Sequence, residues 1–389
     1  MRQRLIYSPG NRAFYKLNFI KTMENLTDLV RRKLDNKIKN SQPTALEAIK
    51  RLENDSRIAR DFIVPVGGRT NNIYWKVKED ILNLDFMEME RKIHQHALSQ
   101  TSERLGIPTV YLRKLAFGQP HEKELAVKIL NSHSQWADPR RFLIRTVGEQ
   151  VRGVLSDQYR RLNGNEIIRG YIEAAYAQGA VLLDGLYTDT KLYAETLYPE
   201  PIIFPTPKNG EVAIAFGARL STSDYGDGAL DLRFFYMQGV CLNGMVRETM
   251  MRQVHLGSKL PSDLRLSDKT YELDTRTTVS AIKDLTAQIF QPEQIKAKME
   301  EIQNASAIEI DISKELRNLQ KNGRLQKDEP EEIERILVAG KPEDGITGEG
   351  TLWKAVQGIT AYAREVEPQR MRDLQEIAGD LMNRAKTTS

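Results

Sequence analysis

The sequence has a single cysteine, Cys241, among 389 residues. An intrachain disulfide framework is therefore excluded, and a reducing compartment is favoured. The sequence also lacks a run of about 18 consecutive apolar residues, which argues against a membrane span. Its beginning has no sustained apolar core of the kind that signal peptides contain. We expect a soluble cytoplasmic protein with no membrane partner.

Several nucleotide-binding and catalytic motifs are absent as well. There is no GxxxxGK[ST] phosphate loop, so a P-loop ATPase is not expected, and the glycines at 67–68 do not continue into a dinucleotide-binding fingerprint. No GxSxG nucleophile elbow occurs. His94 and His96 are two residues apart, so a helix would point them to different faces. We expect no catalytic residue, no cofactor and no bound metal, and we favour a role other than catalysis.

Charge is balanced over the whole chain. The 57 lysines and arginines exceed the 53 aspartates and glutamates by only four, so local clusters must identify any nucleic-acid partner. Hydrophobic residues make up 40% and charged residues 28%, which is usual for a folded protein and argues against global disorder.

The hydrophobic pattern predicts an α+β protein with an antiparallel sheet, a β-hairpin and helix in its core, and helical regions at both ends. The first 60 residues are expected to form two helices separated by a loop over 35–43. A connection over 318–350 is expected to be mobile. The expected regions are a basic helical region (1–60), small strands with helix-turn-helix-like helices (61–137), an α+β core with the candidate DNA-binding domain (138–290), a helical and flexible connector (291–350) and a terminal helical module (351–389).

Within the core, the hairpin is expected at 142–147 and 151–156, and a helix capped by Asn163 or Asn165 should follow it. Before the core, residues 91–135 show a helix-turn-helix pattern. In that pattern one helix ends at a glycine and a proline opens the next helix. The expected core positions of this pattern are Leu105, Ile107 and Leu112.

The most basic segment is RRFLIRTVGEQVRGVLSDQYRRLNG, residues 140–164, with six arginines in 25 residues. A row of guanidiniums beside a tyrosine suits a single strand of nucleic acid, with phosphates on the guanidiniums and a base on the ring. Two of these arginines also precede the start of a helix, whose free N–H groups attract anions. The expected DNA contacts in this segment are Arg140, Arg141, Arg145, Arg152, Tyr159, Arg160 and Arg161.

A second basic cluster follows the last expected strand. Both clusters have an alternative interpretation as surface charge and structural ion pairs, because acidic residues lie nearby at Glu149, Asp157 and Glu166. The residues of the second cluster are Arg247, Arg252, Lys259 and Arg265.

Three aspartates gather in STSDYGDGALDL, at Asp224, Asp227 and Asp231. Such carboxylates can hold a divalent metal for phosphodiester hydrolysis. The favoured alternative is a solvated hairpin turn rich in aspartate and glycine.

Several segments resemble the phage/plasmid-like family called domain of unknown function 932. They are IHQHALSQTSERLGIPTVYLRKL, FLIRTVGEQVRGVLSDQYRRLNGNEII, CLNGMV followed by RQVHLG, and the closing TLWKAVQGITAYAREV. The resemblance covers roughly residues 60–385, and LSDQYRRL and CLNGM are its most specific parts. The sequence departs from the family at Asn163, where an aspartate is common, and near His255, where the family places arginine directly before histidine.

The resemblance implies a setting in phages, plasmids and integrated elements of a bacterial host cell. It also implies a distant relation to phage single-strand annealing recombinases. A ring or filament of identical subunits would then bind single-stranded DNA in a basic groove, without ATP, during homologous recombination. This implication is an analogy at the level of the fold.

The leading hypothesis is therefore an ATP-independent protein that binds and anneals single-stranded DNA. One alternative is a metal-dependent nuclease that uses the three aspartates. Another is a structural or regulatory phage protein that reads duplex DNA through the helix-turn-helix segment.

Overall fold

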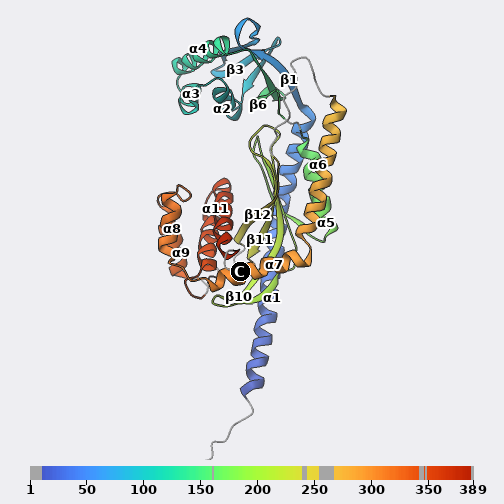
Figure 1. Cartoon of the computed structure of the whole chain (residues 1–389), viewed down its shortest axis with the longest axis vertical. Helices are drawn as coiled ribbons and strands as arrows, with labels where there is room; N and C mark the ends of the chain where they lie inside the picture. Colours follow the sequence, from blue (N-terminus) through green and yellow to red (C-terminus); the bar gives the residue numbers. More distant parts are fainter. Residues whose placement is uncertain are drawn as a thin grey trace, which may run out of the picture.

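The computed structural model describes residues 11–159, 162–238, 243–253, 267–340, 346 and 348–386. They form an α+β protein with helical regions at both ends, as the sequence predicts. Figure 1 shows an upper lobe, built by residues 59–156, above a larger lower lobe that contains the other elements. Within the described ranges, no helix has the length and hydrophobicity that a bilayer span requires.

The upper lobe consists of one sheet and three main helices around their own hydrophobic core. Its strands follow the order β1-β5-β6-β4-β3-β2, in which β4 and β6 run parallel and the other neighbours run antiparallel. The elements are β1 (Ala59–Val66), the short helix η1 (Gly68–Thr70), β2 (Ile73–Lys78), β3 (Ile81–Phe86), β4 (Met89–Ile93), α2 (Gln95–Arg104), α3 (Thr109–Ala116), α4 (Pro120–Trp136), β5 (Arg140–Val147) and β6 (Gln150–Ser156).

The expected hairpin is confirmed. Strands β5 and β6 pair antiparallel, and Val147 lies opposite Gln150 around a two-residue turn in which Gly148 has a φ of 56°. The hairpin also pairs with β1 on one side and with β4 on the other. It therefore belongs to the upper sheet, and the expected boundary at residue 138 falls inside that sheet.

Helices α2 and α3 form the expected helix-turn-helix. Gly106 has a φ of 68° in the turn, and Pro108 occupies the N-cap position of α3. Leu105, Ile107 and Leu112 are buried, as predicted, and pack in the core of the upper lobe.

The lower lobe contains an antiparallel sheet in the order β12-β11-β10-β8-β7, and β9 also pairs with β10. Helix α1 packs along β7 at one edge, and α11 packs against β12 at the other. The elements are α1 (Asn11–Ile58), α5 (Gly164–Ala177), β7 (Val181–Tyr187), β8 (Leu192–Leu197), β9 (Ile202–Thr206), β10 (Gly210–Thr222), β11 (Leu230–Gln238), β12 (Asn243–Gln253), α6 (Asp268–Ile289), α7 (Pro292–Ala307), α8 (Ile312–Lys321), α9 (Glu329–Ala339), α10 (Leu352–Tyr362), η3 (Ala363–Glu365), α11 (Pro368–Leu381) and η4 (Met382–Lys386).

Helix α1 corrects one prediction. The expected loop over 35–43 is helical, and α1 passes through Pro43 although a proline inside a helix removes a backbone hydrogen bond. Packing explains the difference, because Ala45 lies buried against β7. A Cβ atom at Gly185 would lie only 3.0 Å from the Cα of Ala45. The close approach of the two backbones compensates for the lost bond.

The expected mobile connection over 318–350 is also wrong where it forms helices. The end of α8 and all of α9 lie within it, and Leu325 and Ile333 are almost fully or fully buried in the core of the lower lobe. Both helices are short and carry many charges on their outer faces, which conceals the few anchoring positions in the sequence.

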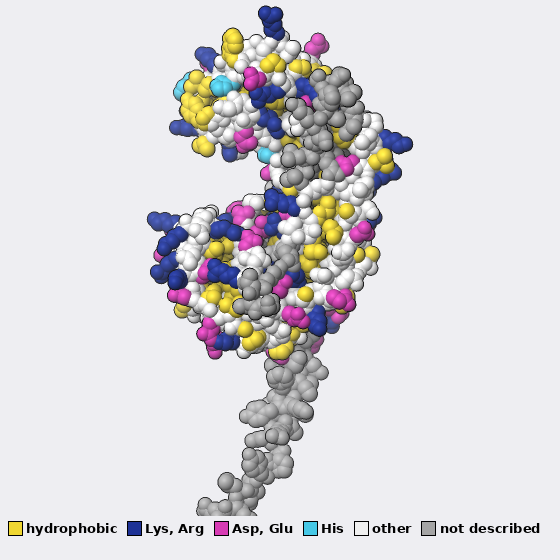
Figure 2. All heavy atoms as spheres, in the orientation of Figure 1, with side chains coloured by type: hydrophobic (Ala, Val, Ile, Leu, Met, Phe, Trp, Pro, Cys, Tyr) yellow, Lys and Arg dark blue, Asp and Glu magenta, His cyan; other side chains and the backbone are white. Residues whose placement is uncertain are grey.

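The two lobes stand apart on one side. Figure 2 shows a wide opening there, between the upper lobe and the C-terminal part of the lower lobe. The upper lobe is one continuous stretch of chain inserted between α1 and α5, and these two helices contact each other in the lower lobe.

Candidate functional site

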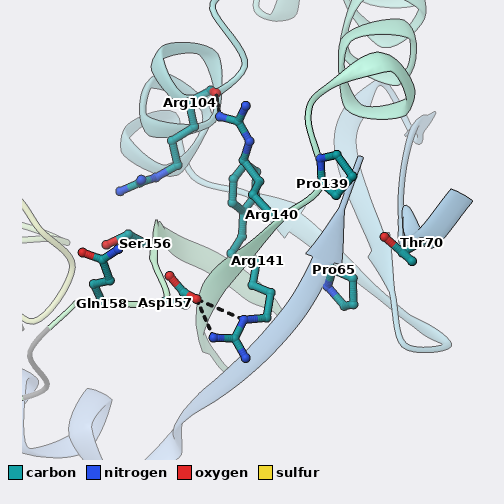
Figure 3. Close-up of a pocket in the computed structure, with 10 residues that line it drawn as sticks. Pro65, Thr70, Arg104, Pro139, Arg140, Arg141, Ser156, Asp157 and Gln158 are labelled. Carbon is teal, nitrogen blue, oxygen red and sulfur yellow. Dashed lines mark hydrogen bonds and ion pairs between the residues drawn. The ribbon is translucent and has the colours of Figure 1, made fainter. Parts of the chain in front are cut away.

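A hollow of about 540 Å³ opens in the upper lobe where α2, β5 and the end of β6 meet. We call it the arginine pocket. Figure 3 shows three arginines at this hollow, one from α2 and two from the start of β5, and the side chains of Arg140 and Arg141 point in opposite directions. The pocket is lined by Pro65, Thr70, Arg104, Pro139, Arg140, Arg141, Phe142, Ser156, Asp157 and Gln158.

The three arginines are held by different partners. Arg141 donates from Nε and Nη2 to one carboxylate oxygen of Asp157, at 3.0 and 2.7 Å. Arg140 donates to the backbone oxygens of Arg104 and Asp138, at 3.0 and 3.1 Å. Arg104 donates from Nε to the backbone oxygen of Val154 at 2.8 Å. These bonds direct all three guanidinium groups to the walls of the pocket.

The charge of the pocket is unbalanced. Asp157 neutralises Arg141, whereas none of the described carboxylates forms an ion pair with Arg104 or Arg140. Burial lowers the pKa of the Arg104 guanidinium. The positive charge of Arg140 adds to this effect, while Glu103 and Asp157 oppose it. An anion bound in the pocket would offset this positive charge and accept hydrogen bonds from a guanidinium group.

The sequence placed Arg140 and Arg141 among the DNA contacts, and the structure brings both into this pocket. It missed Arg104, which lies in the last turn of α2. The segment ERLGIP predicts only a turn between two helices, and nothing in it indicates that α2 ends beside β5. Arg160 and Arg161 lie outside the described residues.

Arg145 and Arg152, in contrast, are structural. Arg145 is 8% exposed and donates to both carboxylate oxygens of Asp61, at 2.7 and 2.8 Å. Arg152 forms an ion pair with Asp55 of α1. Their expected role as phosphate contacts is therefore corrected, because a buried guanidinium (Arg145) or a partly buried one (Arg152) that is paired with a carboxylate is not available to a ligand without breaking the pair.

Tyr159 lies in the core as well. Its side chain is 9% exposed, its hydroxyl group donates to the backbone oxygen of Ser223 at 3.1 Å, and its ring packs with Leu143 and Leu155. The expected stacking of a base on this ring is therefore corrected, because the ring is buried among core residues.

The two described members of the second basic cluster have different environments. Arg247 is 2% exposed and binds Glu301 at 2.5 Å and the backbone oxygen of Gly379. It therefore fastens α7 and α11 to β12, and its expected role in DNA binding is corrected. Arg252 is exposed and lies opposite Asp231 across β11 and β12. Lys259 and Arg265 lie outside the described residues.

The three aspartates of STSDYGDGALDL do not converge. Asp224 accepts a hydrogen bond from the backbone N–H of Gly164 at 3.1 Å, Asp227 accepts one from Thr190, and Asp231 pairs with Arg233 at 2.6 Å. Among the described histidines, cysteines, aspartates and glutamates, no group of three could hold a metal ion. The nuclease hypothesis therefore loses the metal site on which it depends.

The loop between β10 and β11 joins the two lobes instead. The backbone oxygen of Tyr225 lies 3.0 Å from His96 Nε2 and accepts from Gln100 at 2.8 Å, while the backbone oxygen of Asp224 accepts from Arg145 at 2.6 Å. The aspartate-rich turn of the lower sheet is thus fastened to α2 and β5 of the upper lobe.

Asp224 has an unusual environment at this joint. Burial raises the pKa of its carboxyl group to about 6. The guanidinium of Arg145 and the N–H of Gly164 oppose that rise, and Asp61 adds to it. The side chain borders a second hollow of about 590 Å³, which Asp61, Glu166 and Glu272 also line. Arg60 and Arg145 line this hollow too, but the four acidic residues outnumber them, so the arginine pocket is the better candidate for an anion.

Comparisons of the chain with protein-family models, with curated proteins and with solved structures find no significant match. The resemblance to the phage/plasmid-like family stays a prediction from the sequence.

Proposed function

We propose that the protein binds single-stranded DNA without ATP and that the arginine pocket contacts the phosphates. The observation that carries the proposal is the pair Arg104 and Arg140. These two guanidinium groups lie in one open pocket without a carboxylate partner among the described residues. Guanidinium groups present planar sets of N–H donors that match phosphate oxygens, and they stay charged at any physiological pH.

The wider role rests on the resemblance in sequence. We propose that the protein anneals complementary strands during recombination in a phage or mobile element, as a ring or filament of identical subunits. The elements that would serve as the hairpin and helix implied by that resemblance are β5, β6 and α5. Arg141 would act differently from its two neighbours, because its pairing with Asp157 holds one wall of the pocket in place.

Fluorescence anisotropy with a labelled oligonucleotide tests the binding proposal. Each phosphate contact to a single strand contributes about 0.7 to the slope of log affinity against log salt. Arg104→Gln/Arg140→Gln is therefore expected to lower the slope by about 1.4 and the affinity roughly 25-fold at about 0.1 M salt. The control is Arg276→Gln/Arg335→Gln, which removes two exposed charges from weak surface pairs and should bind as wild type does.

Two outcomes would contradict the proposal. One is the absence of binding by the wild-type protein at low salt. The other is equal affinity for wild type and the pocket variant. Annealing has its own measurement, the rate at which two complementary labelled strands pair. Strand binding without faster pairing would reject the annealing role alone.

Recognition of duplex DNA is a second candidate, because α3 occupies the position of a recognition helix and exposes Tyr111 and Lys114. The same anisotropy experiment distinguishes the two functions. Preference for one duplex sequence over single strands, together with loss of binding in Lys114→Gln, would favour the duplex reader.

A further inference from the structure

Helix α8 turns a basic face to solvent in the lower lobe. Lys314, Arg317 and Lys321 are three and four residues apart, so they share one face of the helix, and all three are exposed. Figure 2 shows Lys and Arg side chains gathered where Figure 1 places α8, at the outer edge of the opening between the lobes. We call these three residues the α8 basic face.

The opposite face of α8 fixes its orientation. Leu316 is fully buried in the main core of the lower lobe. Beside it, both carboxylate oxygens of Glu315 accept hydrogen bonds from Arg384 at 2.7 Å. Glu315 is therefore engaged on the inner side of the helix, and packing holds the α8 basic face outward.

The three charges do little for the helix itself. None of them forms an ion pair with a carboxylate in the part of the chain that the structure describes. Lys314 occupies the third helical position, next to the cap residue Asp311, where the positive end of the helix dipole disfavours a cation. Only Lys321, in the last turn, has a position that the dipole favours. Neither ion pairing nor capping accounts for a row of three cations here.

We propose that the α8 basic face is a second phosphate-binding surface for the strand that the arginine pocket binds. This inference rests on the proposed function. From Lys314 to Lys321 the helix rises about 10 Å, which is the length of about three stacked nucleotides in one strand. The arginine pocket belongs to the upper lobe and α8 to the lower lobe, and Figure 1 shows that the two lobes stand apart on the side of α8. A strand that reaches both surfaces must extend from one lobe to the other, so the full site needs a longer strand than the pocket alone.

The test compares two strand lengths. The variant Lys314→Gln/Arg317→Gln/Lys321→Gln removes the α8 basic face, and Lys50→Gln/Lys128→Gln/Lys296→Gln removes three equally exposed charges from α1, α4 and α7. Anisotropy is measured with oligonucleotides of about 10 and about 60 nucleotides over a range of salt concentrations. For the long strand, the α8 variant is expected to lose about 2 from the salt slope and about 100-fold in affinity at about 0.1 M salt. For the short strand it should match wild type, and the control variant should match wild type at both lengths.

Three results would overturn the inference while the proposed function stands. They are wild-type affinity of the α8 variant for the long strand, an equal loss in the control variant, and an equal loss for the short strand. If the wild-type protein binds neither strand at low salt, the proposed function fails first and the inference fails with it.

Discussion

Replacing Arg145 by methionine tests whether this hairpin arginine stabilises the fold or contacts DNA. Its guanidinium faces Asp61 across β1 and β5, with two hydrogen bonds of 2.7 and 2.8 Å, and it donates a third of 2.6 Å to the backbone oxygen of Asp224. In Arg145→Met, the largely buried carboxylate of Asp61 loses the guanidinium group that it pairs with. Loss of one member of a buried ion pair costs about 3–5 kcal/mol, so we expect the free energy of unfolding to fall by that amount.

A second variant separates the charge from the packing. Arg145→Met/Asp61→Leu removes both members of this ion pair, so we expect it to recover to within about 1–2 kcal/mol of wild type. Unfolding in urea, followed by circular dichroism, measures both variants. Arg140→Gln is the matched control on the same strand, and because that side chain is exposed its loss should stay below about 1 kcal/mol. The reasoning is refuted if Arg145→Met also costs less than about 1 kcal/mol, or if the double variant is no more stable than the single one.

Two further predictions concern the joint between the lobes and helix α1. The pKa of Asp224 is about 6 in the folded protein and about 3.9 in an unfolded chain, so its contribution to stability is complete below about pH 4 and is lost as the pH rises through about 6. The free energy of unfolding of Asp224→Asn should therefore rise relative to that of wild type by up to about 3 kcal/mol between about pH 4 and pH 8. Urea titrations at each pH measure this difference, and a difference that does not change with pH would contradict the prediction. Pro43→Ala restores a backbone hydrogen bond inside α1 and should raise the free energy of unfolding by about 1–3 kcal/mol. Thermal unfolding measures this change, and an unchanged midpoint would contradict the prediction.

The elements that the sequence predicts correctly are those with local signals. The hairpin has a glycine at its turn, with a φ of 56° at Gly148, and α5 has Asn163 as its cap, whose side chain accepts from the N–H of Asn165. The buried positions of the helix-turn-helix follow from spacing alone. In each case the physical cause lies within a few residues of the feature, so the sequence displays it directly.

The features that the sequence conceals depend on partners far along the chain. Arg145 pairs with Asp61, 84 residues away, and Arg152 pairs with Asp55, 97 residues away. Both arginines resemble phosphate contacts until these partners are known. The sequence also does not show which sheet the hairpin joins. Its partners β1 and β4 lie before residue 138, where a boundary between two regions is expected. Strand β12, in NGMVRETMMRQ, lacks the alternation of apolar and polar residues that predicts a strand.

The insertion of the upper lobe between α1 and α5 has a consequence for synthesis on the ribosome. Helix α1 is made first, but β7, against which it packs, follows only after the whole upper lobe has been translated. Every pairing of the upper sheet lies within residues 59–156, so that lobe can fold as soon as its last strand emerges. Until β7 arrives, the nascent chain exposes the apolar surface of α1 at Leu34 and Ala45, which the finished protein buries completely. During that interval, the exposed apolar surface of α1 would be a binding site for a chaperone.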